Sequence, residues 1–551
     1  MVTSSLSWPR GLALLLLFVA LFTVVNRGAY QGYWNDDDLD NLNWNRFVSW
    51  GSYAAGLLQP GPFAANFRPV GHAFYKIYSD RFGLQFPPAI LFLHLLHFLN
   101  VLLLWHILRK LGASLLAAGA GALFFGFSMA VFDAFWRPMF VFDVLCAFFL
   151  LAAFLLYLHG QWFWALVPFW LALKSKELAV TFAALVLLYE LLLGGRNWKR
   201  ALPFAAISAL FVAQALYIHR GSNTNYTLRF TPIAIWTCVR FYVIPVLYLC
   251  PLLFLLHRPK VRFGLVAFPF LLGPLLFLPG RLFEVYLYWP LTALAIAVAF
   301  AAQERSPRLV ALLFLPWLAF NFQSMRNQRR AALTVAQENQ AFVRSLEPLR
   351  QQYADVNYVL YDPAPTAMAP WGVSGAVHWF WPSKDVHVFP VDSMPAEAVA
   401  PDQSVLLLSW DRVFRKMTPL FRAPGTPEAS KITMQPGQPV WQLLGGWTGM
   451  VGGFRWSRPV ATARLGVPPG ATLFELGVNV GPVQVQEGYK GHAIISIDGQ
   501  RIGEHEFSQT GWQKYSWPLP RNLPPVVTVE IRLDPHFRDD LGLAITSLEI
   551  R

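Results

Sequence analysis

The sequence has little charge and few cysteines. Only 14% of its 551 residues are Asp, Glu, Lys or Arg, whereas a soluble protein has roughly 25%. By contrast, 55% of the residues are hydrophobic, and apolar runs of roughly 17 or more residues are typical of membrane spans. This composition excludes a soluble globular enzyme and a disordered chain.

The three cysteines, Cys146, Cys238 and Cys250, all lie in apolar runs, so we interpret them as small apolar side chains and not as a disulfide framework. The formal net charge of +13 does not indicate nucleic-acid binding, because much of the basic charge lies in short loops beside apolar runs. The sequence also has no Walker A motif, no dinucleotide-binding glycine pattern and no His-Glu-x-x-His motif. ATP-driven chemistry and nucleotide-sugar binding at a Rossmann site therefore have no support.

Hydrophobicity divides the chain into a membrane part, residues 1–322, and a water-soluble part, residues 323–551. We predict a polytopic α-helical membrane domain of about eleven spans. The first apolar run has no small-residue cleavage site after it, so we interpret it as a retained span and not as a signal peptide. The predicted spans are 10–26, 87–108, 113–131, 140–158, 162–174, 177–194, 201–218, 232–257, 262–278, 286–302 and 307–322.

Basic residues between these runs predict the topology. Cytoplasmic loops are rich in Lys and Arg. If every run spans, one side of the membrane receives Arg10, Arg109-Lys110, Arg196/Lys199/Arg200, Arg258/Lys260/Arg262 and Arg305/Arg308. The loop 27–86, several short connections and the whole tail then lie on the opposite, non-cytoplasmic side.

The tail is predicted to contain two segments. Residues 323–436 form a connecting α/β segment that starts with a polar helix over 326–352, and residues 437–551 form a β-sandwich. An Asp498-Gly499 pair marks a tight hairpin. Trp447, Trp456 and Trp512 either fill the sandwich core or bind glycan. Residues 538–542 lie where carbohydrate-binding sandwiches often have loop or edge residues. The strand candidates are 356–361, 386–389, 404–409, 461–465, 472–478, 493–497, 526–533 and 543–550.

Three adjacent carboxylates, Asp36, Asp37 and Asp38, follow the first span. Such a cluster is either a solvated helix cap or is held together by a cation, an arginine or a shared proton. Other ionisable residues recur at the same predicted rim of the membrane, where they are costly and indicate a functional site. They are Asp133, Arg137, Asp143, Lys174, Lys176, Glu177, Arg281 and Glu284, accompanied by Tyr286 and Tyr288.

In their order along the chain, these residues resemble the GT-C superfamily of polyprenol-dependent glycosyltransferases, in particular its protein O-mannosyltransferase and aminoarabinose-transferase branch. The resemblance covers about residues 8–322. The sequence departs from the family pattern in having three aspartates instead of two and in the displaced position of Arg137. The matching motifs are the acidic run at 36–38, Phe67-Arg68-Pro69, His97 with Asn100, Asp133 with Asp143, Ser175-Lys176-Glu177, and the stretch from Arg281 to Tyr288.

The resemblance implies a membrane glycosyltransferase that moves a sugar from a polyprenyl-phosphate donor to a cell-envelope glycan, lipid or protein. The expected location is a bacterial inner membrane, with the tail periplasmic and the active site facing outward. A single displacement would invert the configuration at the anomeric carbon of the sugar. The implied catalytic residues are Asp37 or Asp38 as general base, with Asp36 and Asp133 as further candidates. The implied donor- and phosphate-binding residues are Arg68, Lys176, Glu177, Arg281, Tyr288 and Arg137.

A divalent cation, Mg²⁺ or Mn²⁺, held by Asp36, Asp37 and Asp38 is left open, because their spacing does not show whether a metal bridges carboxylate and phosphate. The tail resembles the β-sandwiches, some of them carbohydrate-binding, that are appended to other bacterial GT-C enzymes. Trp34, Trp44 and Trp136 are candidates for stacking on sugars. His94, His97 and His106 lie on an apolar helix, where we expect them to make structural hydrogen bonds.

Two other functions remain open. A transporter or flippase of lipid-linked sugars would place ionisable residues near the bilayer midplane and would have two repeated halves, neither of which the sequence shows. A non-catalytic membrane anchor that displays a glycan-binding module would have dispensable aspartates.

Overall fold

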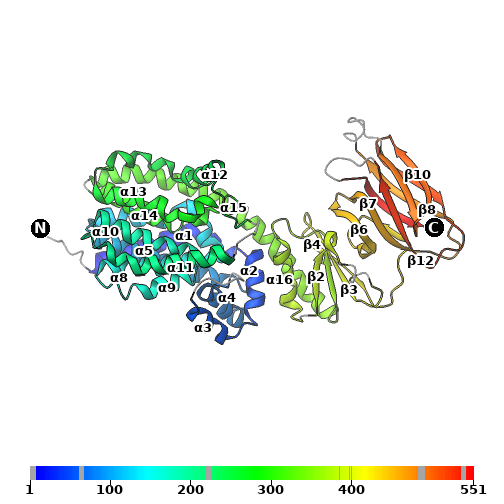
Figure 1. Ribbon diagram of the computed structural model, residues 1–551, viewed down its shortest axis with the longest axis horizontal. Helices are drawn as coiled ribbons and strands as arrows, with labels where there is room; N and C mark the ends of the chain where they lie inside the picture. The colour runs from blue at the N-terminus through cyan, green and yellow to red at the C-terminus, as the bar shows by residue number, and fades with distance from the viewer. Residues whose placement is uncertain are drawn as a thin grey trace. The chain divides into compact units, whose positions relative to one another are not determined.

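The computed structural model describes residues 8–60, 67–218, 225–303, 305–383, 385–395, 398, 400–481, 491–534 and 541–551. The chain forms two compact units, residues 1–336 and 337–551. The first unit is built from helices and the second is rich in β-strands (Figure 1). The predicted order, a helical membrane part followed by a β-rich part, is therefore confirmed.

The first unit consists of α-helices joined by short 3₁₀ segments. Its α-helices are α1 (Trp8–Asn26), α2 (Asp36–Asn45), α3 (Trp50–Leu58), α4 (Pro69–Arg81), α5 (Pro87–Lys110), α6 (Leu115–Gly126), α7 (Asp133–Trp136), α8 (Val141–Leu158), α9 (Leu166–Leu173), α10 (Phe182–Leu192), α11 (Leu202–Ile218), α12 (Pro232–Val243), α13 (Pro259–Leu272), α14 (Pro290–Ala302) and the start of α15 (Pro307–Gln352). Its 3₁₀ segments are η1 (Arg27–Gln31), η2 (Met129–Val131), η3 (Pro138–Phe140), η4 (Glu177–Thr181), η5 (Trp198–Ala201), η6 (Ile244–Leu255), η7 (Gly273–Phe277) and η8 (Glu284–Leu287).

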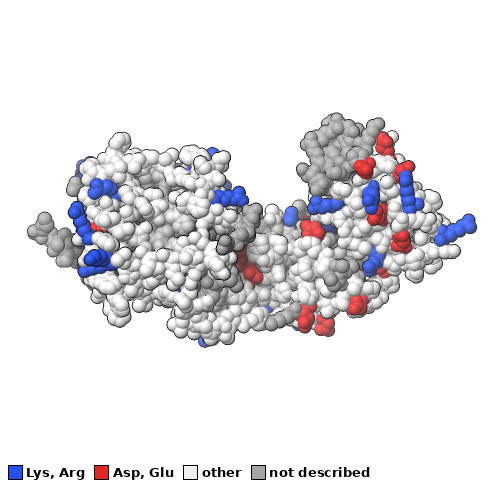
Figure 2. Space-filling model, viewed as in Figure 1, with Lys and Arg blue, Asp and Glu red and all other residues white. Residues whose placement is uncertain are grey.

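Within the described residues, six helical segments are long and apolar enough to cross a membrane, or up to seven if the bent pair α1–η1 and α2 counts as one span. Each predicted span falls on a helical segment, but the number eleven is not confirmed. Several of these segments are short or interrupted: α9 has 8 residues, and Pro251 lies inside η6. The visible face of the helical unit is almost uncharged between its ends (Figure 2). The six helical segments that are long and apolar enough to cross a membrane are Pro87–Lys110, Pro138–Leu158, Trp198–Ile218, Pro232–Leu255, Pro259–Phe277 and Pro307–Gln352.

Close helix packing holds the bundle around α14, in which every residue except Ala301 is buried. Glycines on the neighbouring helices α6 and α13 let the backbones approach, as small residues do in membrane bundles. A Cβ atom at Gly264 of α13 would lie 2.5 Å from the carbonyl oxygen of Ala293. One at Gly121 of α6 would lie 2.7 Å from the carbonyl oxygen of Ala295.

We expect Gly264→Ala to destabilise the bundle by about 1–3 kcal/mol, because the new methyl group meets backbone that cannot move aside. Gly119→Ala on α6 is the matched control, since a Cβ there has nothing within 4 Å. Thermal unfolding of both variants in nanodiscs measures the difference. Equal unfolding temperatures for the two variants would show that α13 and α14 are not tightly packed.

The loop between the first two predicted spans folds into α2, α3 and α4, which lie together at the end of the helical unit away from the N-terminus (Figure 1). Asn35 and Asp38 form a capping box at the start of α2, and the acidic first turn suits the positive end of the helix dipole. Pro69 occupies the first turn of α4, directly after its N-cap residue Arg68. These caps determine where the charged residues of the loop lie.

The second unit begins in the polar part of α15, which confirms the helix predicted over 326–352. It continues into a four-stranded sheet in the order β2-β1-β3-β4, in which β1 runs parallel to β2 and β3, and β4 is antiparallel to β3. The elements are β1 (Tyr358–Tyr361), α16 (Pro370–Phe380), β2 (His387–Pro390), η9 (Val391–Ser393), β3 (Val405–Asp411) and β4 (Lys416–Arg422). This part of the chain therefore combines parallel strands with a helix, and the predicted bounds of the α/β segment, 323–436, stay a prediction.

The rest of the unit is β-structure in which hydrogen bonds join all nine strands into one sheet. The strand β7 pairs with β13 at Arg455 and Trp456 and with β12 from Val460 onward, so two arms, β10-β9-β12 and β13-β8-β11, share it. The separate sheets of a sandwich are therefore not confirmed. The elements are β5 (Lys431–Thr433), η11 (Val440–Gln442), β6 (Leu443–Val451), β7 (Phe454–Gly466), β8 (Leu473–Val480), β9 (Gly491–Ile497), β10 (Gln500–Phe507), β11 (Gly511–Pro518), β12 (Val526–Leu533) and β13 (Ala544–Ile550).

The predicted Asp498-Gly499 turn is confirmed: it joins β9 to β10 with φ angles of 47° and 80°, as a type I′ hairpin turn requires. Of the three tryptophans that were candidates for glycan binding, Trp447 belongs to the buried core, Trp456 is half-buried and Trp512 is exposed. Residues 535–540 lie outside the described residues, so part of the 538–542 motif is not described. A glycan-binding role for this unit stays a prediction.

Candidate active site

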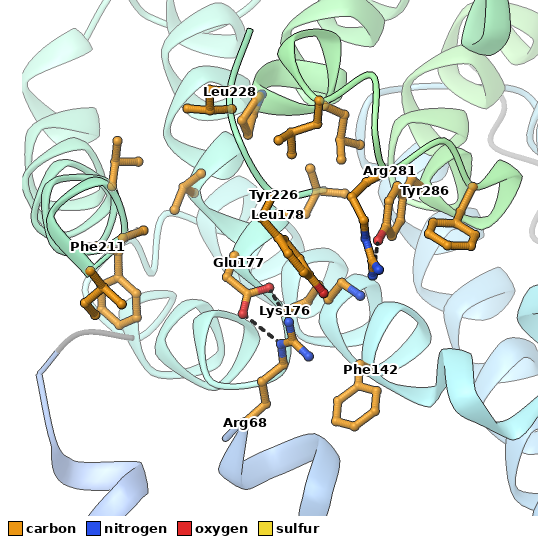
Figure 3. A pocket seen from close by; sticks show the side chains of 18 of the residues that line it. Arg68, Phe142, Lys176, Glu177, Leu178, Phe211, Tyr226, Leu228, Arg281 and Tyr286 are labelled. Carbon is orange, nitrogen blue, oxygen red and sulfur yellow. Dashed lines mark hydrogen bonds and ion pairs between the residues drawn. The ribbon is translucent and has the colours of Figure 1, made fainter. Parts of the chain in front are cut away.

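A cavity of about 790 Å³ lies in the first unit and collects residues from seven parts of the chain (Figure 3). Helix α2, the start of α4, the segment from η3 into α8, the segment around η4, the second half of α11, the loop 226–230 and the loop 274–286 all contribute. Four predicted phosphate-binding residues, Arg68, Lys176, Glu177 and Arg281, line it together with Asp37. Residues more than 200 positions apart in the sequence therefore share one cavity, whereas the roles predicted for them stay predictions.

Two of the lining cations are engaged with carboxylates. Arg68 binds Glu177 through two hydrogen bonds, Nε to Oε1 at 2.7 Å and a terminal guanidinium nitrogen to Oε2 at 3.1 Å (Figure 3). Lys176 donates from Nζ to Oδ2 of the buried Asp143 at 3.1 Å. These ion pairs fix the positions of both cations and offset much of their charge.

Arg281 differs from these two cations. Among the described residues it makes no ion pair with a carboxylate; instead it donates a long hydrogen bond of 3.4 Å to the Tyr286 hydroxyl. Its guanidinium carbon lies 4.5 Å from the ring centre of Tyr226 and 4.9 Å from that of Phe283. Burial lowers the pKa of Arg281, but Tyr286, Tyr226 and the Asp37 carboxylate outweigh it and raise the pKa above its ordinary value. Arg281 is thus a charged, preorganised cation in the cavity wall.

A large part of the cavity wall is apolar. In Figure 3, Phe211 and Leu228 lie away from the group formed by Arg68, Lys176 and Arg281. The cavity therefore has a charged part and a hydrocarbon part, which suits an amphipathic ligand. The apolar lining residues of α11, of the loop 226–230 and of the segment 274–278 are Phe211, Val212, Ala215, Leu216, Ile218, Leu228, Phe230, Pro274, Leu275 and Leu278.

The three adjacent aspartates have different surroundings. Asp37 lines the cavity. Asp36 accepts the backbone N–H of Asp37 at 2.9 Å and is not part of the lining. Asp38 is fully buried, where it accepts the Tyr75 hydroxyl at 2.7 Å and the Asn35 backbone N–H at 3.1 Å. The structure thus separates Asp37, which faces the cavity, from Asp38, which anchors α2 to α4.

Burial of Asp38 leads to a testable pH dependence. Removal from water, with a smaller contribution from the neighbouring Asp37 and Asp36 charges, raises its pKa from 3.8 to about 7, although the hydrogen bonds from Tyr75 and Asn35 oppose the change. Because the folded-state pKa is the higher one, the stability that Asp38 contributes is fully present below about pH 4 and is lost as the pH rises toward 7.

We therefore expect the wild-type protein to lose up to a few kcal/mol of unfolding free energy across this interval. The variant Asp38→Asn, which cannot ionise, should lose less unfolding free energy over the same interval. The test therefore plots unfolding temperature against pH for both proteins in nanodiscs and compares the two slopes. A wild-type slope no steeper than that of Asp38→Asn would mean that Asp38 is not held in a dry environment.

Three other predicted residues lie outside the cavity lining. Asp133 and Arg137 form an ion pair of 3.1 Å with each other. The Tyr288 hydroxyl lies 2.7 Å from His97 Nδ1 and accepts the Asn100 side-chain amide at 3.0 Å. It links α5 to the start of α14, and the neighbouring Tyr286 is the tyrosine that lines the cavity.

The histidines and tryptophans that the sequence singles out are mostly structural. His94, His97 and His106 all hydrogen-bond to backbone carbonyls, as expected for residues with structural roles. Trp34 and Trp136 are buried and donate to Leu84 and Asn26. Trp44 lines the cavity.

Asp36, Asp37 and Asp38, the candidate ligands of a divalent cation, are poorly arranged to bind one. Among the described residues, no group of three or more His, Cys, Asp or Glu side chains could hold a metal ion. Both carboxylate oxygens of Asp38 already accept hydrogen bonds, and Asp36 binds the start of its own helix. The aspartate triplet is thus not a ready-made set of ligands, and we derive no step through a metal.

Sequence reasoning missed several lining residues, chiefly Asp40, Asn41, His72 and Tyr226. A signal for the first two was present, because positions 37, 40, 41 and 44 share one face of a helix. No signal in the sequence indicated that the loop containing Tyr226 returns to the wall of the cavity.

No family model matches the chain, and no curated protein matches it. Among solved structures, the chain is similar to ArnT from Cupriavidus metallidurans in the apo state, with a TM-score of 0.45 and 13% identity, covering 73% of this chain and 94% of that one. ArnT bound to undecaprenyl phosphate gives the same TM-score and coverage with 14% identity. The arabinofuranosyltransferase AftD from Mycobacteria gives a TM-score of 0.41 with 12% identity, covering 100% of this chain and 61% of that one. These likenesses are weak, so the function proposed below rests on the residues and the cavity.

Proposed function

We propose that this chain is a GT-C glycosyltransferase that transfers a sugar from a polyprenyl-phosphate donor to an acceptor in the cell envelope. The observation that carries the proposal is the cavity itself. It combines a carboxylate, a group of cations and a long apolar wall in a bundle whose helices can cross a membrane. A membrane anchor needs no such cavity, and a transporter of lipid-linked sugars needs no carboxylate placed as a general base beside the cations.

The cavity matches a lipid phosphate in charge and in polarity. The phosphate would lie near Arg281, whose guanidinium is the cation not committed to a carboxylate among the described lining residues. The polyprenyl chain would lie along Phe211, Leu216 and Leu228, where burial of hydrocarbon is favourable. Such a ligand enters from the bilayer with its head group at the membrane rim.

In the proposed reaction, Asp37 acts as the general base. It accepts the proton of an acceptor hydroxyl as the hydroxyl oxygen attacks the anomeric carbon of the donor. The bond between that carbon and the phosphate oxygen breaks, so the phosphate leaves with the bonding electron pair while the glycosidic bond forms. A single displacement of this kind inverts the anomeric configuration.

The cations stabilise the departing phosphate. The polyprenyl phosphate gains one negative charge as it leaves, and a preorganised guanidinium holds that charge without reorganisation of solvent. Arg281 makes the main contact, and Lys176 assists from its ion pair with Asp143. Arg68 and Glu177 position each other and keep the net charge of the cavity low before the donor enters.

The orientation of the protein follows from the basic loops. We infer that the cavity and the second unit face the periplasm of a bacterial inner membrane, where lipid-linked sugars meet envelope acceptors. There the strand-rich unit would be able to contact the acceptor.

The test uses the full chain in nanodiscs with radiolabelled undecaprenyl-phosphate sugars and an extract of envelope glycans and lipids. The proposal predicts that label leaves the lipid carrier and becomes attached to an extract component. Retention of the label on the carrier for every donor, with correctly folded protein, would contradict the proposal.

A further inference from the structure

We propose that the cavity-facing side of α2 is a sugar-binding subsite, in which Trp44 is the stacking platform and Asp40 and Asn41 receive the hydroxyl groups. This inference rests on the proposed function and extends it from the phosphate to the sugar. Its ligand is a sugar ring without a carboxylate group.

The subsite is set by helix geometry. Asp37, Asp40, Asn41 and Trp44 all line the cavity and are spaced i, i+3, i+4 and i+7. This spacing places them on one face of α2, so the face begins at the general base and continues for about two turns along the wall. A sugar bound there lies beside the carboxylate that we assign to deprotonation of the acceptor.

Trp44 is held as a platform by its neighbours. Its ring packs at 4.8 Å from the His72 ring and 6.1 Å from the Phe67 ring, and these two rings stack on each other at 5.5 Å. The indole therefore sits against an aromatic support while it lines the cavity. An indole face of this kind packs against the apolar C–H groups of a sugar.

Asn41 is fixed in orientation by a short chain of hydrogen bonds. His72 Nδ1 lies 2.8 Å from the Arg68 backbone nitrogen and 3.1 Å from the Arg68 carbonyl oxygen. Because the backbone N–H can only donate, we assign Nδ1 as its acceptor and place the His72 proton on Nε2, which then donates to Asn41 Oδ1 at 3.1 Å. Asn41 Nδ2 in turn donates to the Asp37 carbonyl at 2.7 Å. The amide retains a second N–H and a second lone pair for a ligand.

His72 is suited to this positioning role because it stays neutral. Burial and the nearby Arg68 charge lower its pKa to about 3. A neutral imidazole keeps one donor and one acceptor, so the chain from Arg68 to Asp37 does not change with pH in the physiological range. Helix α2, with the base, and the N-cap of α4, with Arg68, are therefore coupled through one side chain.

The charges on α2 select the type of sugar. The cavity-facing side of the helix has two carboxylates, Asp37 and Asp40, and no cation. A carboxylated sugar would be repelled there, whereas the hydroxyl groups of an uncharged sugar donate to carboxylate oxygens. The cations lie on other elements, where the phosphate is expected.

The test measures binding in nanodiscs for the wild type, Trp44→Ala, Asp40→Asn and the control Trp50→Ala, an exposed tryptophan outside the cavity lining. The first probes are undecaprenyl phosphate alone and the same lipid phosphate linked to glucose, galactose, mannose or arabinose. The second probe is a mixture of neutral envelope oligosaccharides, added with undecaprenyl phosphate already bound.

Trp44→Ala is expected to weaken binding of one sugar-bearing probe by about tenfold and to leave binding of the bare lipid phosphate unchanged. Weaker binding of the glycosylated lipid assigns the subsite to the donor sugar, and weaker binding of the oligosaccharide assigns it to the acceptor.

Two results would overturn the subsite: no loss with either sugar probe, or the same loss with the bare lipid phosphate. Failure of the proposed function looks different, because wild-type protein would then leave the label on the lipid carrier in the transfer assay, whatever the binding measurements show.

Discussion

Asp37→Asn is expected to lower the rate of sugar transfer by about a hundredfold to ten-thousandfold, the usual contribution of a general base. The amide keeps the size of the side chain but cannot accept the acceptor's proton. Donor binding should change little, because the phosphate contacts come from other elements. Initial rates with a labelled lipid-linked donor, together with donor affinity, separate the two effects.

Asp36→Asn is the matched control, since it makes the same change one residue earlier, outside the cavity lining. Its amide oxygen can still accept the Asp37 backbone N–H, so the helix cap and the transfer rate should be preserved. Equal rate losses in the two variants would assign the effect to the local charge or to the fold of α2 and not to a base at position 37.

Arg281→Gln is expected to weaken binding of undecaprenyl phosphate by roughly ten- to a hundredfold, because a charge-assisted contact contributes about 1.5–3 kcal/mol. The loss should exceed that of the other lining cations, since Arg68 and Lys176 already share their charge with Glu177 and Asp143. Titration of the lipid phosphate into protein reconstituted in nanodiscs measures it.

Arg281→Lys should retain part of the affinity, because it keeps the charge but loses the planar fork of donors. Arg137→Gln provides the control: this arginine pairs with Asp133 outside the cavity lining, and we expect no loss of lipid-phosphate affinity. A larger effect at Arg137 than at Arg281 would place the phosphate elsewhere in the bundle.

Much of the architecture could be predicted from local patterns. The apolar runs predicted spans that each fall on a helical segment of the first unit. Alternating hydrophobicity predicted the strands β7, β8, β9, β12 and β13. The strands β4, β5, β6, β10 and β11 were not predicted. Of these, β4, β10 and β11 are edge strands that expose much of their length, which leaves little hydrophobic alternation. The span count could not be settled, because short and broken helices look alike in sequence.

The site was partly predictable. Arg68, Lys176, Glu177 and Arg281 do share a cavity, and their motifs were visible because ionisable residues are rare in apolar surroundings. Local sequence could not separate Asp37 from Asp38, since the choice depends on how α2 turns and on Tyr75, which is 37 positions from Asp38. For the same reason it could not tell that Tyr286 faces the cavity while Tyr288 binds His97.

The most direct test of the central claim is a cryo-electron microscopy structure of the protein in nanodiscs with undecaprenyl phosphate. We predict density for the phosphate within hydrogen-bonding distance of the Arg281 guanidinium and density for the chain along Phe211 and Leu216 of α11. Lipid phosphate bound elsewhere, for example beside Asp133 and Arg137, with no ligand density in the cavity, would contradict the account.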